Sequence, residues 1–205
     1  GSKGIKRKNL KILGKEPLIN FSLKTLLKVK EINRIIVSTE DKEIKNHCKK
    51  IDKKIEVLDR PLKLADDKTP LTSVVHYVSQ QLNQNNQYHK FVLQVAPTCP
   101  FVKTNSIKKL IKILTSKKSN CAVTLKKIEH EHPYRAKILN RNGSFNQFIK
   151  NINVEKFISR QDLPILYCTS GAIYGRSYNL LKNFTHKDFC FGKKPYGIVL
   201  DEIES

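Results

Sequence analysis

Residues 1–10 carry the side chains best suited to chemistry on a phosphate group: two glycines, one serine hydroxyl and four cations, followed at once by an apolar segment. Glycine lets the backbone approach a ligand closely, so main-chain N–H groups can point at phosphate oxygens. The lysines would supply the countercharge. The stretch therefore predicts a loop that wraps a polyphosphate.

The spacing in this segment fits neither common phosphate-binding pattern. Gly-x-x-x-x-Gly-Lys-Ser/Thr and Gly-x-Gly-x-x-Gly are both absent from residues 1–10. Taken alone, a basic Gly-Ser start is more typical of a flexible terminus, or of a residue pair left by an expression vector. The loop hypothesis thus depends on motifs that follow.

With three later motifs, this opening resembles the acylneuraminate cytidylyltransferase family, the synthetases of CMP-sialic acid and of its legionaminic and pseudaminic relatives. The family's loop reads approximately Ala-Arg-x-x-Ser-Lys-Gly-x-x-x-Lys-Asn. The residues at the matching spacing are Ser2, Lys3, Gly4, Lys8 and Asn9. The resemblance implies that they bind the nucleotide, with Lys3 and Lys8 as catalytic cations. The family's preceding strand and its Ala-Arg would lie before Gly1, so we expect both termini to be incomplete.

Residues 59–70 form the second motif. From Arg60 to Asp67 they follow the family's Arg-Pro-x-x-Leu-Ala-x-Asp, a segment that lies over the cytidine. The planar guanidinium of arginine can hydrogen-bond a pyrimidine oxygen and a phosphate in fixed geometry. The resemblance makes Arg60, Asp67 and Thr69 candidate nucleotide-binding residues. The alternative for Arg60 is a structural ion pair with Asp66 or Asp67.

The third motif, residues 97–100, resembles a Pro-Thr-Ser-Pro turn that follows a glutamine facing the sugar acid in the family. Here the residue before the turn is Ala96. Gln94 stands two residues earlier and so on the same face of the predicted strand. Gln94 is therefore a sugar-binding candidate by position alone.

Residues 159–174 form the fourth motif and resemble the family's Arg-Gln-x-Leu-Pro, five residues, then Asn-Gly-Ala-Ile-Tyr. The resemblance implies that Arg160 clamps the sugar carboxylate, a paired contact that lysine cannot reproduce, and that Tyr174 also faces the sugar. Ser170 replaces the usual asparagine, keeping a hydroxyl and losing an amide. By itself, Gly-Ala-Ile-Tyr also fits an ordinary buried strand. Phe189 and Phe191, two residues apart, could offer one apolar face to an acetamido methyl group, although core packing is the commoner role.

The resemblance implies a cytoplasmic homodimer that converts CTP and an acidic nine-carbon 2-keto sugar to a CMP-sugar and pyrophosphate. It also implies Mg²⁺, whose ligands we expect beyond Ser205, since Asp201, Glu202 and Glu204 do not match the family's Asp-Ile-Asp-Thr. The alternatives are a neighbouring nucleotidyltransferase that uses the eight-carbon acid Kdo, a basic binding protein, or a paralogue that kept the fold and lost activity.

Composition narrows these classes. The net charge is +21, but the lysines are spread along the chain without interleaved aromatic residues, which disfavours nucleic-acid binding. Five scattered cysteines argue against a disulfide framework and a zinc site. His130 and His132 beside glutamates could hold a metal, but no third ligand stands at conventional spacing. No apolar run is long enough to span a bilayer, so no membrane contact is expected.

The spacing of apolar residues predicts the helices and strands that position these residues. Apolar periodicity indicates helices over 17–29, after Asp41, from Thr69–Pro70, and after Thr104. Asp41 and Thr104 are expected to cap their helices, and the last helix is expected to face inward with Ile107, Leu110, Ile111 and Leu114. Strands are expected at 33–39, 55–58, 90–95, 120–127 and 195–200, with a β-hairpin over 134–149. This order is typical of βαβ units. We expect one α/β domain over 1–205, Rossmann-like and three-layered with a mainly parallel sheet, of the nucleotidyltransferase, glycosyltransferase-A type, from which about 128–165 departs as a β-hairpin dimerisation excursion.

Ligands of such sheets bind outside the carboxyl ends of the strands. We therefore expect Lys8 in the opening loop and Arg160 with Tyr174 in the late motif to converge on one cleft at a single sheet edge.

Overall fold

The computed structural model describes residues 5–66, 68–85, 88–116, 119–185 and 189–205. Its α-helices are α1 (Leu18–Leu27), α2 (Lys42–Ile51), α3 (Leu71–Gln84), α4 (Thr104–Ser116) and α5 (Tyr178–Lys182). Its strands are β1 (Ile12–Leu13), β2 (Glu16–Pro17), β3 (Ile35–Thr39), β4 (Ile55–Asp59), β5 (Phe91–Val95), β6 (Cys121–Lys127), β7 (Lys137–Leu139), β8 (Phe145–Gln147), β9 (Tyr167–Ser177) and β10 (Tyr196–Val199). Short 3-10 turns are η1 (Lys8–Leu10), η2 (Leu62–Leu64), η3 (Pro133–Arg135), η4 (Val154–Phe157) and η5 (Arg160–Asp162).

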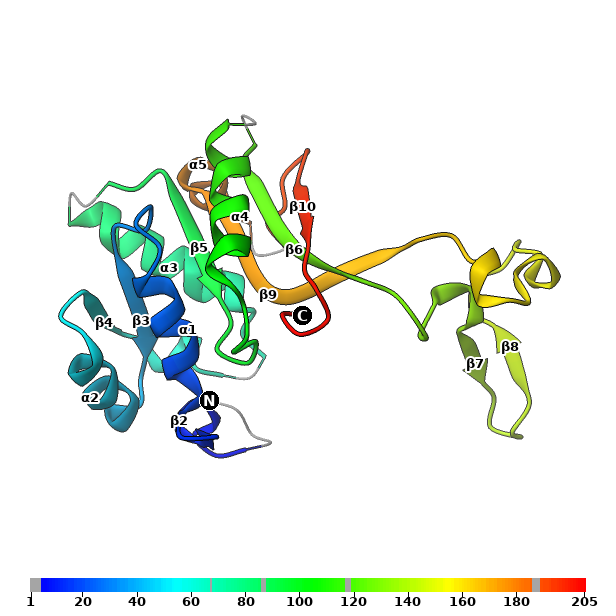
Figure 1. Ribbon diagram of the computed structural model, residues 1–205, viewed down its shortest axis with the longest axis horizontal. Coiled ribbons are helices and arrows are strands. Elements are labelled where there is room, and N and C mark those ends of the chain that lie inside the picture. The colour runs from blue at the N-terminus through cyan, green and yellow to red at the C-terminus, as the bar shows by residue number, and fades with distance from the viewer. Residues whose placement is uncertain (1–4, 67, 86–87, 117–118, 186–188) are drawn as a thin grey trace.

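Four strands form the main sheet, in the order β10–β6–β9–β5 (Figure 1). β10 pairs with β6 in parallel, whereas β9 pairs antiparallel with both β6 and β5. The expectation of a mainly parallel sheet is therefore corrected to a mixed one. The cause is the connection, because β9 returns from a long excursion and not from a crossover helix, which is what a parallel neighbour requires.

β3 and β4 pair in parallel as a second ladder, joined by α2 as the predicted βαβ unit. Asp41 caps α2 as expected: its Oδ1 accepts hydrogen bonds from the N–H groups of Glu43 at 2.8 Å and Ile44 at 3.2 Å. Cys48 of α2 is fully buried against this pair of strands. Burial raises the pKa of its thiol to about 11, so the thiol stays protonated at neutral pH.

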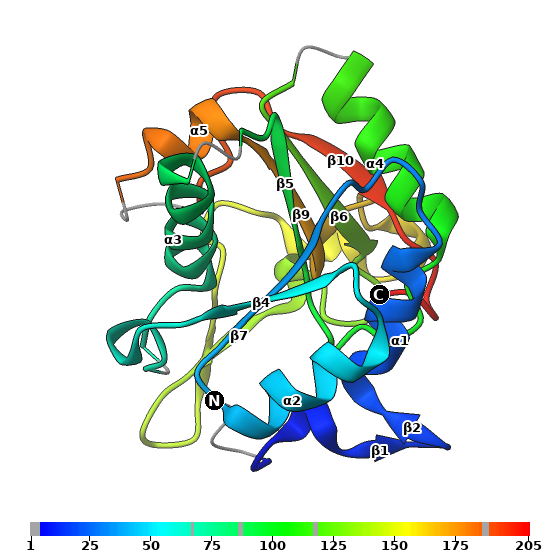
Figure 2. The ribbon, with the colours of Figure 1, turned by 90° about the vertical axis from the view of Figure 1, so that its left-hand side faces the viewer.

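Helices lie on both sides of the main sheet (Figure 2). α4 packs its predicted inner face, Ile107, Leu110 and Leu114, into the principal core. α3 and α5 lie on the other side, where Leu181 packs with Val92 of β5. Within the described ranges, no helix combines the length and the apolar character needed to cross a membrane.

The last residues of the chain are tied to the start of α4. The buried carboxylate of Glu204 accepts the N–H of Lys103 at 2.6 Å, and Asp201 pairs with the ammonium group of Lys103. A carboxylate at this position satisfies a donor at the helix start and interacts favourably with the helix dipole. Thr104, predicted as the cap, is instead the first residue of α4.

β9 bends where its register against β6 shifts across Thr124. Gly171 has a φ of +79°, in the left-handed region that favours glycine. Thr124 is fully buried in the bend, where its Oγ1 accepts the N–H of Ile173 at 2.9 Å and the hydroxyl of Ser170 at 2.8 Å, and donates to the carbonyl of Ile173 at 3.1 Å. One hydroxyl therefore closes a bulge that would otherwise leave buried polar groups unpaired.

Residues 128–166, here called the arm, project from the body between β6 and β9 (Figure 1). Inside the arm, β7 pairs antiparallel with β8, where the sequence predicted a hairpin. At its neck, the N–H of Ile128 donates to the carbonyl of Leu166 at 2.9 Å. The Nε2 atom of His132 lies 3.1 Å from the carbonyl oxygen of Pro164. His132 thus helps to join the two segments of the chain that form the neck.

Thr124→Val should lower the free energy of unfolding by about 1–3 kcal/mol, because it keeps the shape but orphans the hydroxyl's partners in the bulge. Thr124→Ser is the matched control, which keeps the hydroxyl and should cost about 1 kcal/mol or less for one methyl group. Urea unfolding of both variants checks this. Equal losses would show that packing, and not the hydrogen bonds, stabilises the bend.

Candidate functional site

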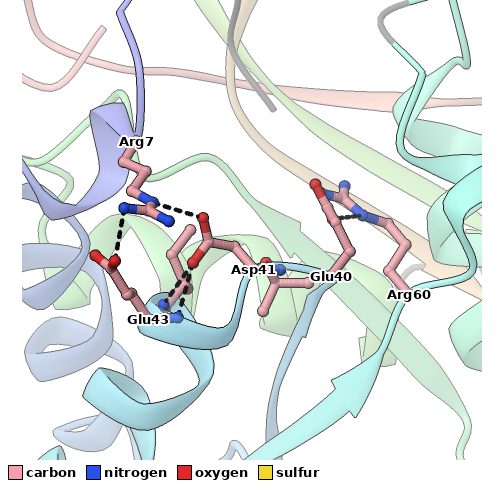
Figure 3. A network of polar contacts seen from close by, with 7 residues as sticks. Arg7, Glu40, Asp41, Glu43 and Arg60 are labelled. Carbon is pink, nitrogen blue, oxygen red and sulfur yellow. Dashed lines mark hydrogen bonds and ion pairs between the residues drawn. The ribbon is translucent and has the colours of Figure 1, made fainter.

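Arg7 anchors the basic loop to the chain that follows β3 (Figure 3). Its Nε donates to Oδ2 of Asp41 at 2.9 Å, and its Nη1 lies 2.6 Å from Oε1 of Glu43. The φ of Arg7 is 51°, a left-handed conformation that non-glycine residues rarely adopt. The two ion pairs hold the backbone in that turn and so fix the start of η1.

Asp41 joins the loop to the helix, since one carboxylate oxygen caps α2 and the other accepts from Arg7. Partial burial opposes ionisation of this carboxylate. The hydrogen bonds from Arg7 and from the N–H groups of Ile44 and Glu43 outweigh that effect and hold the pKa of Asp41 below its usual value. The Asp41 carboxylate is therefore charged near neutral pH, where it can pair with Arg7.

Lys8 and Asn9 lie in η1 and are partly exposed. Beside them is a pocket of about 350 Å³ lined by Lys6, Arg7, Leu10, Lys11 and Glu43. With three cations to one carboxylate, this surface attracts anions. Ser2, Lys3, Gly4 and Asp67 lie outside the described residues, so their assignment to the nucleotide stays a prediction.

Arg60 follows β4 and turns toward the end of the neighbouring strand (Figure 3). Its Nε and Nη2 lie 2.7 and 2.5 Å from Oε2 of Glu40, the residue after β3. The structural alternative named Asp66 or Asp67, of which Asp67 lies outside the described residues. The carboxylate that pairs with Arg60 is that of Glu40, because parallel strands bring their carboxyl ends together. Partial burial of Glu40 opposes ionisation, yet the hydrogen bond from Arg60 holds the pKa of Glu40 below its usual value. Thr69 donates to the carbonyl of Lys63 at 3.4 Å and closes the turn before α3.

Two of the predicted sugar-binding residues, Gln94 and Tyr174, lie on the main sheet, and a third, Phe189, adjoins them from the segment between α5 and β10. Gln94 of β5 lies opposite Tyr174 of β9 in the strand register. The ring of Tyr174 stacks on Phe191 with centroids 6.2 Å apart, and Phe191 stacks on Phe189 at 5.7 Å. Phe189 is 73% exposed, so this aromatic row ends at the surface and not in the core.

The residue that joins this cluster is Arg176, to which no motif pointed. Its Nη1 donates to Oε1 of Gln94 at 3.1 Å, and its guanidinium carbon lies 5.1 Å from the centroid of the Tyr174 ring. The one clue in the sequence is spacing, since a residue two positions after Tyr174 on a strand points to the same face.

Ser170 is placed in the bulge of β9. Its hydroxyl donates to Thr124 at 2.8 Å and accepts the N–H of Ala172 at 3.2 Å. This hydroxyl therefore shapes the strand that carries Tyr174, and its predicted contact with the sugar stays a prediction.

Arg160 lies on the arm, in η5, and pairs with Glu129. Together they line a second pocket of about 350 Å³ at the base of the arm, with Lys127 and His132 among the other lining residues. The two pockets have no lining residue in common. Within one chain, Arg160 and the loop of Lys8 thus line no common pocket, contrary to the expected convergence, and the arm that carries Arg160 projects away from the body (Figure 1).

The described residues offer no fit for a divalent metal. No three His, Cys, Asp or Glu side chains among them are grouped so as to hold an ion. Asp201 and Glu204, the acidic residues nearest the expected Mg²⁺ motif, are both engaged by Lys103. His132 contacts the neck of the arm, so the alternative of a histidine metal site gains no support from this region.

The family comparison decides the class of protein. The family model described as Cytidylyltransferase matches residues 1–190. This chain belongs to the cytidylyltransferase family. It is therefore a nucleotidyltransferase enzyme, as the four motifs predicted.

Two relatives agree with this class, and a solved structure shows the fold. The pseudaminic acid cytidylyltransferase of Campylobacter jejuni is 30% identical over 202 residues, covering 97% of this chain and 82% of the relative. The N-acylneuraminate cytidylyltransferase of Escherichia coli is 23% identical over 215 residues, covering all of this chain and 46% of the relative. The solved structure of a CMP-2-keto-3-deoxy-manno-octonic acid synthetase in complex with CTP superposes with a TM-score of 0.68 at 14% identity, covering 98% of this chain and 86% of that one. This last likeness shows a common α/β fold.

Asp41→Ala should destabilise the protein by about 1 kcal/mol at neutral pH, because α2 loses its cap. Asp41→Asn is the matched variant, since asparagine still caps a helix but cannot form the ion pair with Arg7. Chemical unfolding across a pH series measures both variants.

The pH dependence has a defined sign. Because the pKa of Asp41 is lower in the folded state, its charge stabilises the fold above the unfolded pKa, and that contribution is lost as the pH falls through the folded pKa. The stability difference between wild type and Asp41→Asn should therefore shrink between about pH 5 and about pH 2. A difference that stays constant over this range would contradict the assigned ion pair.

Proposed function

We propose that this enzyme transfers the cytidylyl group of CTP to an acidic nine-carbon 2-keto sugar and releases pyrophosphate. The observation that carries the proposal is the cluster on β5 and β9, where Gln94, Tyr174 and Phe189 meet through Arg176 and Phe191. The similarity to pseudaminic acid and N-acylneuraminate cytidylyltransferases extends over nearly the whole chain and supports a nine-carbon acid.

In the proposed reaction, the anomeric hydroxyl oxygen of the sugar attacks the α-phosphorus of CTP in line. An oxygen–phosphorus bond forms, the bond to the bridging oxygen of pyrophosphate breaks, and the hydroxyl proton leaves to solvent. Catalysis of this step consists of positioning and of charge neutralisation. Lys8 and the predicted Lys3 would neutralise the triphosphate, and Arg60 would contact the nucleotide from the end of β4.

Mg²⁺ remains the expected cofactor on the strength of the resemblance alone. It would supply further charge neutralisation at the triphosphate. The described carboxylates do not form a site for Mg²⁺, so the steps given above use only residues of the chain itself.

We further propose that the arm forms a homodimer contact. It exposes large apolar side chains at Leu139 (73%), Phe145 (63%) and Ile158 (82%). Exposed apolar surface on a projecting segment is typical of an interaction site. In a dimer, the arm is also the element that can bring Arg160 to the sugar site of a second chain, which its own chain does not do.

The direct test is pyrophosphate release from CTP by the full-length protein, supplied in turn with pseudaminic acid, N-acetylneuraminic acid and Kdo. We expect kcat/KM for at least one nine-carbon acid to exceed that for Kdo by about tenfold or more, because pocket contacts discriminate between substrates at that level. Omitting the sugar acid should abolish release.

Lys8→Ala provides a matched variant for this assay. It should raise the KM for CTP by a similar factor with every acid, since its proposed contact is with the triphosphate. Turnover of Kdo alone would contradict the nine-carbon assignment. Pyrophosphate release that does not depend on the sugar acid, together with salt-sensitive RNA binding, would favour the alternative of a basic binding protein.

The arm proposal predicts a change of mass in solution. Wild type should be a dimer by size-exclusion chromatography with light scattering, and Leu139→Glu with Phe145→Glu should be a monomer, because two charges on the apolar surface resist burial. Asn142→Glu, at the turn of the same hairpin, is the control and should remain dimeric. A monomeric wild-type protein would refute the interface.

A further inference from the structure

Arg176 is a buried cation in the middle of the proposed sugar site. Only 2% of its surface is exposed, although arginine is rarely buried to that degree. It lies on β9 opposite Val92 of β5, while Tyr174 lies opposite Gln94. Because alternate residues of a strand share a face, Arg176, Tyr174, Val92 and Gln94 all point toward the side of α3 and α5.

The guanidinium of Arg176 spans two separate parts of the site. Nη1 donates to Oε1 of Gln94 at 3.1 Å. Nε donates to the carbonyl of Cys190 at 3.1 Å, and Nη2 donates to the carbonyl of Phe189 at 2.9 Å. One side chain therefore links β5 to the segment that carries the aromatic row.

The chemistry of arginine fixes the orientation of the Gln94 amide. A guanidinium has five N–H donors and no acceptor, so the group of Gln94 that meets it must be the carbonyl oxygen. The amide nitrogen of Gln94 then points away from Arg176. Among the described residues, none accepts a hydrogen bond from that nitrogen. Gln94 is thus held as a hydrogen-bond donor whose partner must come from outside those residues.

The same guanidinium holds the aromatic segment. Cys190 has a φ of 57°, and its carbonyl and that of Phe189 both turn to Arg176. This backbone geometry sets the position of Phe191, whose ring stacks on Tyr174. The aromatic row and the Gln94 donor are consequently fixed relative to each other by one residue.

We propose that Arg176 is a positioning residue for the sugar acid: it locks Gln94 as a fixed hydrogen-bond donor and sets the aromatic row beside it. The site would thus select a ligand with an acceptor oxygen, of a carboxylate, carbonyl or hydroxyl group, next to an apolar or flat surface. This inference rests on the proposed function, because it takes the cluster to be the sugar side of the active site.

The first test changes Gln94 and leaves Arg176 in place. Gln94→Glu keeps an acceptor for Arg176 and strengthens that contact with a charge, but it removes the donor. We expect an unfolding temperature no lower than that of wild type. The KM for the sugar acid should rise about tenfold, the effect of one lost hydrogen bond, while the KM for CTP changes by less than about twofold.

The second test weakens the hydrogen bonds of Arg176 to Gln94 and to the two carbonyl groups. Arg176→Lys keeps the positive charge, but a single ammonium nitrogen cannot span Gln94 and both carbonyls. In the ¹⁵N–¹H spectrum, the side-chain amide pair of Gln94, assigned by its absence in Gln94→Glu, should shift toward the values of a solvent-exposed glutamine. The KM for the sugar acid should rise, with the KM for CTP unchanged. Arg34→Met is the control, an arginine that pairs with Glu56 outside the site, and should alter neither readout.

The outcomes separate the two proposals. An unchanged sugar KM in Gln94→Glu, or an unshifted amide pair in Arg176→Lys, overturns the positioning role. Equal rises in both KM values in Arg176→Lys indicate a merely structural arginine and also overturn it. A wild-type enzyme that turns over none of the three acids contradicts the proposed function alone. The amide spectrum reports the contact between Arg176 and Gln94 without any turnover.

Discussion

The hydrogen bonds of one buried hydroxyl, that of Thr124, hold in place the strand that carries the proposed sugar site. They close the bulge through which β9 passes from the arm into the main sheet. Beyond the bulge, β9 presents Tyr174 and Arg176 to one side and Gly175 to α4. Because side chains alternate along a strand, a slip of one residue would turn both functional side chains into the core under α4. The register of β9 is thus the constraint that the site depends on.

The nucleotide side is arranged by charge pairs at the carboxyl ends of β3 and β4. Arg7 and Arg60 are each paired with carboxylates that follow β3, namely Asp41, Glu43 and Glu40. These ion pairs help to fix the shape of the loops. Lys8 forms no ion pair with any described residue, which agrees with its proposed contact with a phosphate. A loop with a high positive charge can be ordered when neighbouring carboxylates neutralise part of that charge, as Asp41 and Glu43 do for Arg7.

Local patterns in the sequence were sufficient for features that depend on neighbouring residues. The cap of α2 by Asp41, the inner face of α4 and the strands of the body follow from periodicity and from short-range hydrogen bonding. The direction of β9 does not, because a strand pairs in parallel or antiparallel according to where its connection returns, and that connection is the arm. The partner of Arg60 was missed for a similar reason: Glu40 is 20 residues away in sequence and adjacent only because two strands end side by side.

Among the candidate site residues, a motif pointed to Tyr174, strand position to Gln94 and spacing to Phe189, and the structure joins them. Arg176 belongs to no motif, and a buried arginine cannot be told from a surface one by its neighbours in sequence. The expected convergence of Lys8 and Arg160 failed within a single chain because Arg160 travels with the arm. Resemblance to a family thus supplied the candidate contact residues, while the arginine that joins two of them became visible only in three dimensions.

One strand, β9, connects the arm to the proposed sugar site. β9 starts at the neck, where Tyr167 to Thr169 pair with Lys127 to Leu125, and runs on to Arg176. A twist of the neck therefore reaches Tyr174 only through the bulge at Gly171, so the hydrogen bonds of Thr124 govern how much of the arm's movement the cluster feels.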